Sequence, residues 1–596
     1  MKFPLTLVTS MVCVGAMSYA CVGTPQNQTA GEAATVEAQS RELAGPEVRL
    51  VFWNDFHASL YEIDEVDNDE WALGGLPVFM AAVEALRGPG LSLLLDAGDM
   101  FQGAMPINAS RGMGNIEIMN ALRLDAAVIG NHEFDYGPGS QMTDDPRGAL
   151  FEAIQASTFS WVSANIVAAS QDVAWPPENL HAYVIISKGP YRIAVTGLTT
   201  QETPVATLAE NVEGLRFESP AGTLQRIMPQ ILAEEPDFIV VLAHLTGVPK
   251  YDESGSEMFS GELGDIMALP EEIRQHIGLI VSGHEHASFL VWDGETLLSE
   301  DNSGGRVLTT LTLQPKLGAK GLQIERDSVR KHTLRHRMRS LGCGEEPRHI
   351  ETVQAGDLTL TPDRRAIDFI ARFEARMTNG RCDVMGCAET ALRRSRRGEC
   401  PIGNLVTNAM MAYSPQADAV MQNSGGLRAD LPAGSIYREN MNSLMPFDNR
   451  FLLIEITGRD LSQVLKISST SRHGVIQVAG LTYQYEQGCI RPEDLNGDGQ
   501  IEAWENNCLC KNVTVRGEPL QADKTYQIGL SDFMYYGGDS LKGLFDQTKI
   551  LHTGPIIKSL IEDYIKGHET CFSEAGLVDQ DRPRLRIAAC SDGYMD

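Results

Sequence analysis

The sequence predicts an α/β protein that contains more than one domain. Short apolar segments, 48–53, 91–95 and 238–243 among them, alternate with helix-like stretches, which is the pattern of a sheet covered by helices. Polar residues of similar types follow several of these segments, as expected where strands end at one edge of a sheet. The chain has 596 residues, more than one domain usually holds. We expect a first domain over 45–334, a bridge over 335–381 and a second domain over 382–596.

Five predicted strands end in side chains of the types that bind metal ions. The residues that follow them are Asn54, Asp55 and His57; Asp96 and Asp99; Asn131, His132, Glu133 and Asp135; His244; and His284, Glu285 and His286. Strands that lie side by side would bring these side chains together at one edge. A lone histidine after a strand is usually an ordinary satisfied histidine, and an aspartate there often caps a helix. Five such strand ends together favour a metal site.

The composition of this set favours two metal ions over one. Its seven candidate ligands are Asp55, His57, Asp99, Asn131, His244, His284 and His286. They are more than a tetrahedral zinc site uses, and a carboxylate such as that of Asp99 can bridge two ions. Oxygen and imidazole ligands without cysteine suit zinc, manganese or iron, so the identity of the metal stays open.

At these motifs the sequence resembles the bacterial and animal 5'-nucleotidase family, whose first domain is a calcineurin-like metallophosphoesterase. The matching segments are Asn54-Asp55-Phe56-His57, Gly98-Asp99-Met100-Phe101-Gln102-Gly103, Gly130-Asn131-His132-Glu133-Phe134-Asp135, Ala243-His244 and Gly283-His284-Glu285-His286. The resemblance implies an αββα sandwich for the first domain. It also implies that one metal is bound by Asp55, His57, Asp99 and His286, and the other by Asp99, Asn131, His244 and His284.

The resemblance assigns a separate role to His132. It is similar to the family's catalytic histidine, which contacts the phosphate and is oriented by a carboxylate, here Asp135. Two neighbouring cations can activate a water molecule for in-line attack and neutralise the phosphoryl oxygens, so no protein nucleophile is needed. A protonated His132 would add a donor at the developing charge or the leaving oxygen.

The second domain resembles the C-terminal, substrate-binding domain of the same family, which implies an α+β nucleotide-binding domain. The matching segments are Gly403-Asn404-Leu405, Asn423-Ser424-Gly425-Gly426-Leu427-Arg428, Met445-Pro446-Phe447-Asp448-Asn449 and Phe533-Met534-Tyr535-Tyr536-Gly537-Gly538-Asp539. By this resemblance, Phe447 and Phe533 stack on the base and Asp539 accepts the ribose hydroxyls. Asn423, Arg428 and an upstream arginine, by position Arg396, hold ribose or phosphate. The cluster Arg393, Arg394, Arg396 and Arg397 leaves the choice of that arginine open.

The bridge between the domains is expected to contain a helix. It would begin near Thr361-Pro362-Asp363, because the apolar residues Ile367, Ile370, Phe373 and Met377 follow at helical spacing.

The N-terminus predicts export. Lys2, the apolar stretch 3–17 and the small-residue pattern at 18–20 are typical of a signal peptide over 1–20, followed by a tether over 21–44 that cannot build a core. Cleavage before Cys21 would permit a lipid anchor, so plain secretion and lipidation both stay open, in the periplasm or at the cell surface. The net charge of −30 argues against nucleic acid and anionic membranes as partners. The oligomeric state stays open.

The cysteines predict disulfides in the second half of the chain. None of the eleven lies between Cys21 and Cys343. Spacing suggests local bridges around 382–400 and around 489–510.

A calcium site is predicted inside the second domain. The run 494–505 fits a twelve-position EF-hand loop, with ligands at Asp494, Asn496, Asp498, Gln500 and Glu505 and a turn at Gly499. A full EF-hand has a helix before its loop, but the residues that precede this run are not predicted to form one. We therefore expect a structural calcium ion on an insertion near 489–510, with an acidic turn as the alternative.

The function that best fits these features is a secreted or lipid-anchored 5'-nucleotidase that hydrolyses nucleoside 5'-phosphates to nucleoside and phosphate by metal-activated water. An alternative keeps the metal chemistry but acts on cyclic nucleotides, nucleotide sugars or another phosphorus or sulfur ester. A third possibility is a surface nucleotide-binding or interaction protein whose catalysis is incidental.

Overall fold

The structure, a computed structural model, describes residues 45–65, 68–171, 173–251, 257–337, 343, 352–376, 380–470, 474–492, 506–541, 543–545 and 548–589. The helices and strands all belong to one compact unit, Pro46–Asp596. The predicted signal peptide and tether, 1–44, and the predicted calcium loop, 494–505, lie outside the described residues.

Two sheets form the centre of the first part of the chain. The first has the order β19-β18-β1-β4-β5-β6-β8, and the second has the order β16-β17-β15-β12-β10-β9. The strands of the first sheet are β1 (Val48–Trp53), β4 (Leu91–Asp96), β5 (Ala126–Val128), β6 (Ser160–Val162), β8 (Leu180–His181), β18 (Val307–Pro315) and β19 (Leu322–Ile324). Those of the second are β9 (Tyr183–Lys188), β10 (Tyr191–Thr199), β12 (Phe238–His244), β15 (Leu279–Gly283), β16 (Ser288–Asp293) and β17 (Thr296–Asp301).

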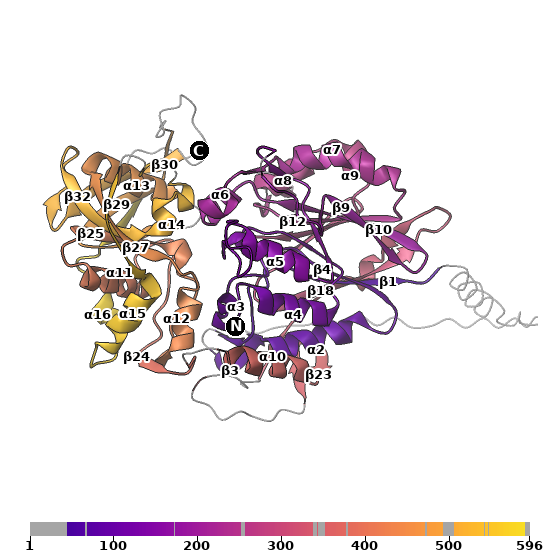
Figure 1. Cartoon of the computed structure of the whole chain (residues 1–596), viewed down its shortest axis with the longest axis horizontal. Coiled ribbons are helices and arrows are strands. Elements are labelled where there is room, and N and C mark those ends of the chain that lie inside the picture. Colours follow the sequence, from indigo (N-terminus) through magenta and orange to yellow (C-terminus); the bar gives the residue numbers. More distant parts are fainter. Residues whose placement is uncertain are drawn as a thin grey trace, which may run out of the picture. The chain divides into compact units, whose positions relative to one another are not determined.

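Apolar side chains from both sheets meet between them. Phe52 and Leu95 of the first sheet share a buried cluster with Val240 and Leu242 of the second. The outer face of the first sheet is covered by α2 (Leu76–Arg87), α4 (Met113–Leu122) and α5 (Gly148–Ala156). The outer face of the second is covered by α7 (Pro220–Ala233) and α8 (Gly261–Met267), and Figure 1 shows these on the opposite side from α2 and α4. The layers are therefore helix, sheet, sheet, helix, as expected.

The central strands run parallel, so they end at common edges. Trp53 of β1 pairs with Asp96 of β4, and His244 of β12 pairs with Gly283 of β15. The loops that follow β1, β4, β5, β12 and β15 hold the polar motifs found in the sequence. Parallel pairing is thus what brings residues from five distant segments to one place.

A helix lies in the predicted bridge. It is α10 (Arg364–Glu374), and its N-cap is Asp363, whose side chain accepts a hydrogen bond of 2.8 Å from Arg365 N. The expected apolar face is correct at Ile370 and Phe373 but wrong at Ile367, which is 43% exposed. The buried stripe runs through Ala366, Ile370 and Phe373, and this leaves Ile367 at its margin. Met377 lies outside the described residues.

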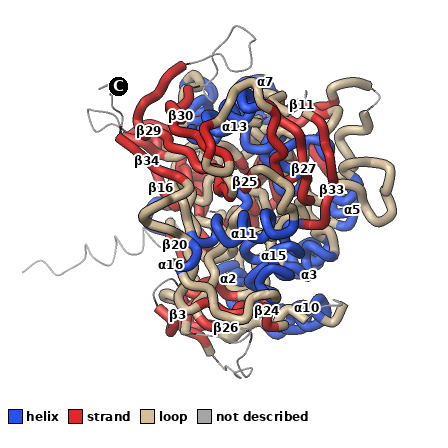
Figure 2. The backbone as a smooth tube through the Cα atoms, turned by 90° about the vertical axis from the view of Figure 1, so that its left-hand side faces the viewer, coloured by secondary structure: helices blue, strands red, loops and turns tan. Residues whose placement is uncertain are grey.

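The last part of the chain combines helices with mixed sheets, in which β25 pairs with β32 and β29 with β34 in parallel and the other neighbours pair antiparallel. One sheet has the order β28-β25-β32-β27-β33 and another the order β31-β30-β29-β34. Their main strands are β25 (Ala419–Asn423), β27 (Arg450–Thr457), β28 (Ile476–Ala479), β29 (Leu481–Pro492), β30 (Asn506–Val515), β32 (Thr525–Ser531), β33 (Lys549–Ile556) and β34 (Leu585–Ala589). The helices α11 (Pro401–Tyr413), α12 (Arg438–Leu444) and α15 (Ile557–Lys566) pack in one buried cluster, and α13 (Gly458–Thr470) packs in a second. Figure 2 shows β29, β30 and β34 as neighbours.

Two disulfides are present among the described residues, and neither is the local bridge expected around 382–400. Cys343 pairs with Cys382, and Cys387 of β24 (Val384–Ala388) pairs with Cys571. Cys400 is free and buried, and its sulfur accepts a hydrogen bond from Gly403 N at the start of α11. That expectation was wrong because tertiary pairing decides the partners: Phe572 N donates to Cys387 O at 2.9 Å, which brings the two chain segments together. A bridge around 489–510 stays a prediction.

Candidate functional site

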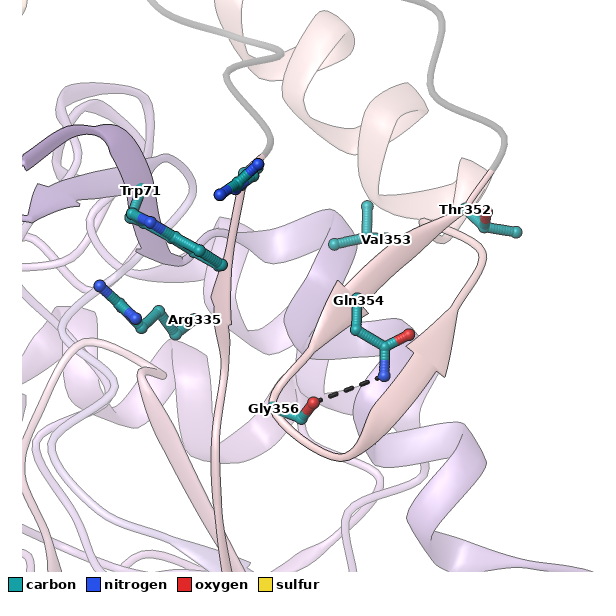
Figure 3. Close-up of a pocket in the computed structure, with 7 residues that line it drawn as sticks. Trp71, Arg335, Thr352, Val353, Gln354 and Gly356 are labelled. Carbon is teal, nitrogen blue, oxygen red and sulfur yellow. Dashed lines mark hydrogen bonds between the residues drawn. The ribbon is translucent and has the colours of Figure 1, made fainter.

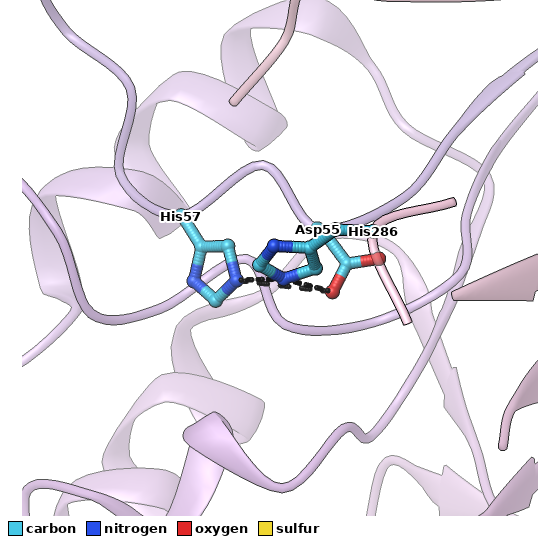
Figure 4. A group of neighbouring side chains, drawn as sticks. All are labelled: Asp55, His57 and His286. Carbon is cyan, nitrogen blue, oxygen red and sulfur yellow. Dashed lines mark hydrogen bonds and ion pairs between the residues drawn. The ribbon is translucent and has the colours of Figure 1, made fainter. Parts of the chain in front are cut away.

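The first group of candidate metal ligands is formed by Asp55, His57 and His286. Asp55 and His57 follow β1, and His286 follows β15. His57 Nε2 lies 3.0 Å from His286 Nε2, and His286 Nε2 lies 3.2 Å from Asp55 Oδ1. Figure 4 shows the three side chains facing one another. Three donor atoms at this separation can coordinate a single cation.

The second group is formed by Asp99, His244 and His284, with Asn131 beside it. His244 Nε2 lies 3.1 Å from Asp99 Oδ2, and His284 Nδ1 lies 2.8 Å from Asn131 Oδ1. All seven candidate ligands from the sequence therefore lie in two adjoining groups. The described structure has two candidate metal-binding sites.

The tautomers of two histidines fit a metal. His57 Nδ1 faces the carbonyl oxygens of Phe101 and Gln102 at 3.3 and 3.2 Å, and His244 Nδ1 faces that of Ala97 at 2.9 Å. A carbonyl can only accept, so each Nδ1 carries a proton and, when the ring is neutral, the lone pair lies on Nε2. Both Nε2 atoms point at the carboxylates of their groups, which is the arrangement of a ligating imidazole held by an outer hydrogen bond. The donor set therefore fits divalent cations.

The charges of the two groups are consistent with this fit. Burial raises the pKa of Asp99, but the facing His244 and His132 outweigh it and hold this pKa well below the usual value. Burial and the neighbouring His286 lower the pKa of His57 to about 3, so His57 is neutral at physiological pH. Burial disfavours the cation of His244, but Asp99 overcomes this and raises its pKa to about 10. A proton and a metal ion compete for that same nitrogen.

His132 stands beside these groups and is held by a carboxylate. Its Nδ1 lies 2.6 Å from Asp135 Oδ2, and Asp135 Oδ1 accepts a hydrogen bond of 2.8 Å from Thr207 Oγ1. His132 Nε2 lies 4.0 Å from Asp99 Oδ2. Burial lowers the pKa of His132, but Asp135 and Asp99 outweigh it and raise the net pKa. The imidazole therefore favours its protonated form and turns Nε2 toward the second group.

Glu133 was not among the site residues predicted from the sequence. Its buried carboxylate accepts four backbone N–H groups, from Asp99, Met100, Phe101 and Gly130, at 2.6 to 3.2 Å. Burial and then the charge of Asp99 raise the pKa of Glu133 to about 7. The side chain ties the loop of Asp99 to the loop of Asn131 and His132. At Gly130 a Cβ atom would lie 2.2 Å from Asp99 Oδ1, so only glycine permits this approach.

Five of the seven candidate ligands have left-handed backbone. Their φ angles are 49° at Asp55, 48° at His57, 54° at Asp99, 92° at His284 and 54° at His286. This conformation is unfavourable for residues other than glycine and is concentrated at functional sites, where the surrounding structure maintains it. Its concentration at the candidate ligands supports a functional role for them.

Phe447, predicted from the sequence, lies against His132, and Arg428 lies beside Phe447. The ring of Phe447 is 5.9 Å from that of His132, and the Arg428 guanidinium lies 5.8 Å from the ring of Phe447. Arg428 is half-buried. Burial and then the charges of Arg396 and Arg394 lower its pKa to about 10. The arginines are therefore close enough to repel one another, which an anion between them would relieve.

The remaining C-terminal candidates form a second cluster. Asn423 Nδ2 donates to Asp539 Oδ2 at 2.8 Å, and a Cβ atom at Gly538 would lie 2.4 Å from the ring of Phe533. Asp539 also has left-handed backbone, with φ 55°. No direct ring contact joins Phe447 to Phe533 in the described part of the chain.

One pocket lies apart from all these residues. Its volume is about 490 Å³, and it is lined by Trp71, Arg335, Arg337, Val353 and Gln354, with Thr352 and Gly356 (Figure 3). The guanidinium of Arg335 lies 4.2 Å and that of Arg337 4.7 Å from the Trp71 ring centre. This pocket contains none of the candidate ligands.

Among the described residues, we find no helix with the length and apolar character that a bilayer span requires.

Two family models match the chain. Residues 48–288 match the calcineurin-like phosphoesterase model, and residues 377–546 match the 5'-nucleotidase C-terminal domain model. Among curated proteins, the snake venom 5'-nucleotidase of Naja atra is 24% identical over 87% of this chain and 96% of its own length. Endonuclease YhcR of Bacillus subtilis is 22% identical over 95% of this chain, which spans 43% of that protein.

A solved structure supports the same architecture. The 5'-nucleotidase precursor from Thermus thermophilus superposes with a TM-score of 0.69 at 23% identity, over 91% of this chain and 99% of that one. At this identity the likeness concerns the fold. Together with the two family models, it confirms the expected α/β architecture, with a metallophosphoesterase domain followed by an α+β C-terminal domain.

Proposed function

Because the chain belongs to the 5'-nucleotidase family and is a metal-dependent phosphoric ester hydrolase, we propose that it hydrolyses nucleoside 5'-phosphates to nucleoside and phosphate. One observation carries the proposal: the Phe447 ring, a candidate for base stacking, lies 5.9 Å from the ring of His132, which borders both candidate metal sites. Groups for phosphate chemistry and for nucleoside binding thus face one another.

We propose that the two candidate metal groups each hold a divalent transition metal. Asp55, His57, Asp99 and His286 would bind one ion, and Asp99, Asn131, His244 and His284 would bind the other. When bound, two such ions supply an activated water at neutral pH and neutralise charge on the phosphoryl oxygens. Zinc, manganese and iron all suit these ligands.

In this proposal His132 donates a proton or hydrogen bond from Nε2 to a phosphoryl or leaving oxygen. Asp135 holds Nδ1 and stabilises the imidazolium, and Thr207 fixes the other oxygen of Asp135. The carboxylates of Asp135 and Asp99 raise the pKa of His132 and so favour the imidazolium, the form that donates. His132 is a catalytic residue and Asp135 orients it.

The C-terminal residues would select the nucleotide. Phe447 and Phe533 would stack on the base, a contact that contributes on the order of 1 to 3 kcal/mol for each ring. Asp539 would accept the ribose hydroxyls, with Asn423 orienting it through their hydrogen bond. Arg428 and Arg396 would hold the phosphate or ribose.

The experiment that tests this function is a substrate panel with metal analysis on the purified enzyme. We expect turnover of nucleoside monophosphates, and we expect Phe447→Ala and Phe533→Ala to reduce it far more than hydrolysis of p-nitrophenyl phosphate. Equal turnover of all phosphoesters by wild type and both variants would contradict nucleotide specificity.

A second candidate substrate class is supported by the likeness to a protein named as an endonuclease. The same metal chemistry could act on a cyclic nucleotide, a nucleotide sugar or another phosphorus or sulfur ester. Including such esters in the panel separates the two candidates, since preferential cleavage of any of them over nucleoside monophosphates would favour this one.

We also propose that the protein is exported to the periplasm or cell surface, with residues 1–20 removed as a signal peptide and the mature chain either secreted or lipid-anchored at Cys21. The two disulfides support an oxidising compartment. Mass spectrometry of the mature N-terminus tests this, and an unmodified Cys21 would exclude the anchor.

We further propose a structural calcium ion in the loop 494–505. The flanking strands support it, because Pro492 of β29 pairs with Asn506 of β30 and so brings the two ends of the loop together. Calorimetric calcium binding and a melting temperature lowered by chelation are expected. Absence of both would contradict it.

A further inference from the structure

The side chain of Asn108 joins the loop of Asp99 to the segment that holds Phe447. Asn108 lies in the short helix α3 (Met105–Ala109), which follows that loop. Its Oδ1 accepts hydrogen bonds from Gly103 N at 3.0 Å and from Tyr136 OH at 2.8 Å. Tyr136 OH in turn accepts one from Gln102 N at 2.8 Å. The amide oxygen is thus held by the metal-binding domain.

The amide nitrogen of Asn108 points to the other domain. Nδ2 donates a hydrogen bond of 2.9 Å to the carbonyl of Pro446. The orientation of the amide is determined by its partners, because the two donors at Oδ1 require an acceptor there and the Pro446 carbonyl requires a donor. A neighbouring contact reinforces this one: Asn442 Nδ2 lies 2.7 Å from Met105 Sδ.

The bond to Pro446 acts directly on Phe447, the next residue. Pro446 is buried, and its backbone therefore has little freedom to move away from Asn108. On the other side, Arg428 N donates to Leu444 O at 2.8 Å, which holds the same segment beside Arg428. Phe447 is thereby placed between His132 and Arg428.

The loop at the other end of Asn108 belongs to the metal centre. His57 Nδ1 faces the Gln102 carbonyl at 3.2 Å, and a Cβ atom at Gly103 would lie 1.9 Å from His57 O. Gln102 and Gly103 are therefore packed tightly against a candidate ligand. A displacement of Pro446 relative to this loop would change the distance between the Phe447 ring and the reacting phosphate.

We propose that Asn108 is a positioning residue for Phe447, and that its bond to Pro446 sets the preference of the enzyme for phosphates that carry a nucleoside over small phosphoesters. The inference rests on the proposed function, since it assigns base stacking to Phe447. Asn108 itself does not touch the substrate. A base gains stacking energy only if the ring is at the right distance when the phosphate is at the metals.

The substitution Asn108→Asp tests this with little change of shape. A carboxylate retains the acceptor for Gly103 N and Tyr136 OH but cannot donate to the Pro446 carbonyl, which it repels. The matched control is Asn120→Asp. The Oδ1 of Asn120 also accepts two hydrogen bonds, from Thr158 N and Thr158 Oγ1, and its Nδ2 donates to the carbonyl of Ala156 at 2.9 Å. Asn120 therefore has the same hydrogen-bonding pattern as Asn108 but is remote from the site.

The measurement is the ratio of kcat/KM for adenosine 5'-monophosphate to that for p-nitrophenyl phosphate. We expect Asn108→Asp to lower this ratio about tenfold, mainly through a higher KM for the nucleotide, as loss of one hydrogen bond to a buried carbonyl predicts. Asn120→Asp should leave the ratio unchanged. In a Phe447→Ala background the Asn108 substitution should have no further effect on the ratio, because the two residues act through one contact.

Several outcomes would overturn the inference. An unchanged ratio in Asn108→Asp would do so, as would equal losses with both substrates, which would mean that Asn108 acts on the metal loop instead. Additive losses in the double variant would show that Asn108 does not act through Phe447. Wild-type enzyme that hydrolyses the aryl phosphate but no nucleotide would refute the proposed function itself, and this is measured before any variant.

Discussion

Glu133 illustrates how one side chain organises two ligand loops. Its carboxylate accepts N–H groups from both the segment of Asp99 and Gly130, the neighbour of Asn131. A carboxylate with several backbone donors is fixed in place and fixes them in turn. The positions of Asp99 and Asn131 therefore depend on a residue that is not a candidate ligand.

We predict that Glu133→Gln weakens metal binding about 10- to 100-fold, as loss of an outer-shell partner does. Metal content after dialysis measures this, and excess manganese or zinc should restore activity. The control is Glu152→Gln, since Glu152 also accepts backbone N–H groups, from Gln141 and Met142, in a loop remote from the ligands. Full metal retention in Glu133→Gln would contradict the prediction.

We predict that His132→Ala lowers kcat about 10²- to 10⁴-fold, the range of general acid catalysis, without lowering metal content. The ring is not counted among the ligands, so both ions should remain. His276, an exposed histidine of the same domain, provides the control His276→Ala. An unchanged kcat would remove His132 from the mechanism.

The roles of some single residues can be predicted from the sequence, and those of others cannot. The candidate ligands were predictable, because Asp55 or His244 at a strand end is an unusual choice for folding alone. Glu133 and Asn108 were not, because their roles are hydrogen bonds to backbone atoms distant in sequence, and such bonds leave no pattern of residue types. The distance between Phe447 and His132 also required the structure.

At the scale of elements, the parallel strands and the disulfides play different parts. The strands β1 and β4, and likewise β12 and β15, pair in parallel so that their last residues lie side by side, and this brings the ligands that follow them together. The disulfide Cys387–Cys571 joins segments 184 residues apart, whereas Cys343–Cys382 spans 39. A crosslink restricts the unfolded chain more when it closes a longer loop.

We predict that replacing both Cys387 and Cys571 by serine costs more unfolding free energy than replacing Cys343 and Cys382. The loop-closure difference is roughly 1 kcal/mol, on a background of about 2 to 4 kcal/mol for a disulfide. Urea denaturation under oxidising conditions measures it. Cys400→Ser is the control, since it removes a sulfur without removing a crosslink and keeps a capping acceptor for Gly403 N. A larger loss from the Cys343–Cys382 pair would contradict this order.

Elements were predictable where periodicity was strong. The apolar strands follow from runs of buried side chains, and α10 follows from its N-cap and spacing. The disulfide partners were not predictable from spacing, because Cys387 meets Cys571 through strand-like backbone pairing between distant segments.

For the whole molecule, the metal ions should contribute to folding as well as to catalysis. The carboxylates of Asp55 and Asp99 are buried. Neighbouring histidines, which are themselves candidate metal ligands, hold the pKa values of both carboxylates below the usual value. Any ion that binds only the folded state stabilises it, by about 2.7 kcal/mol when its concentration is 100 times Kd.

We predict that chelation abolishes activity and lowers the melting temperature, and that added divalent metal restores both. Elemental analysis should give two transition metal ions per chain. Full activity after exhaustive chelation, or a single ion at saturation, would contradict the dinuclear assignment.

The left-handed backbone of Asp55, His57, Asp99, His284 and His286 has an evolutionary consequence. Glycine adopts this conformation without strain, so replacing these residues by glycine would relieve strain in the metal-free chain while it removes the ligands. Relatives that have lost catalysis could therefore keep the fold, and even become more heat-resistant, by drifting toward glycine at these positions. Selection for hydrolysis opposes that drift, as do the hydrogen bonds that Asp99 and Asp55 accept from His132 N and His284 N.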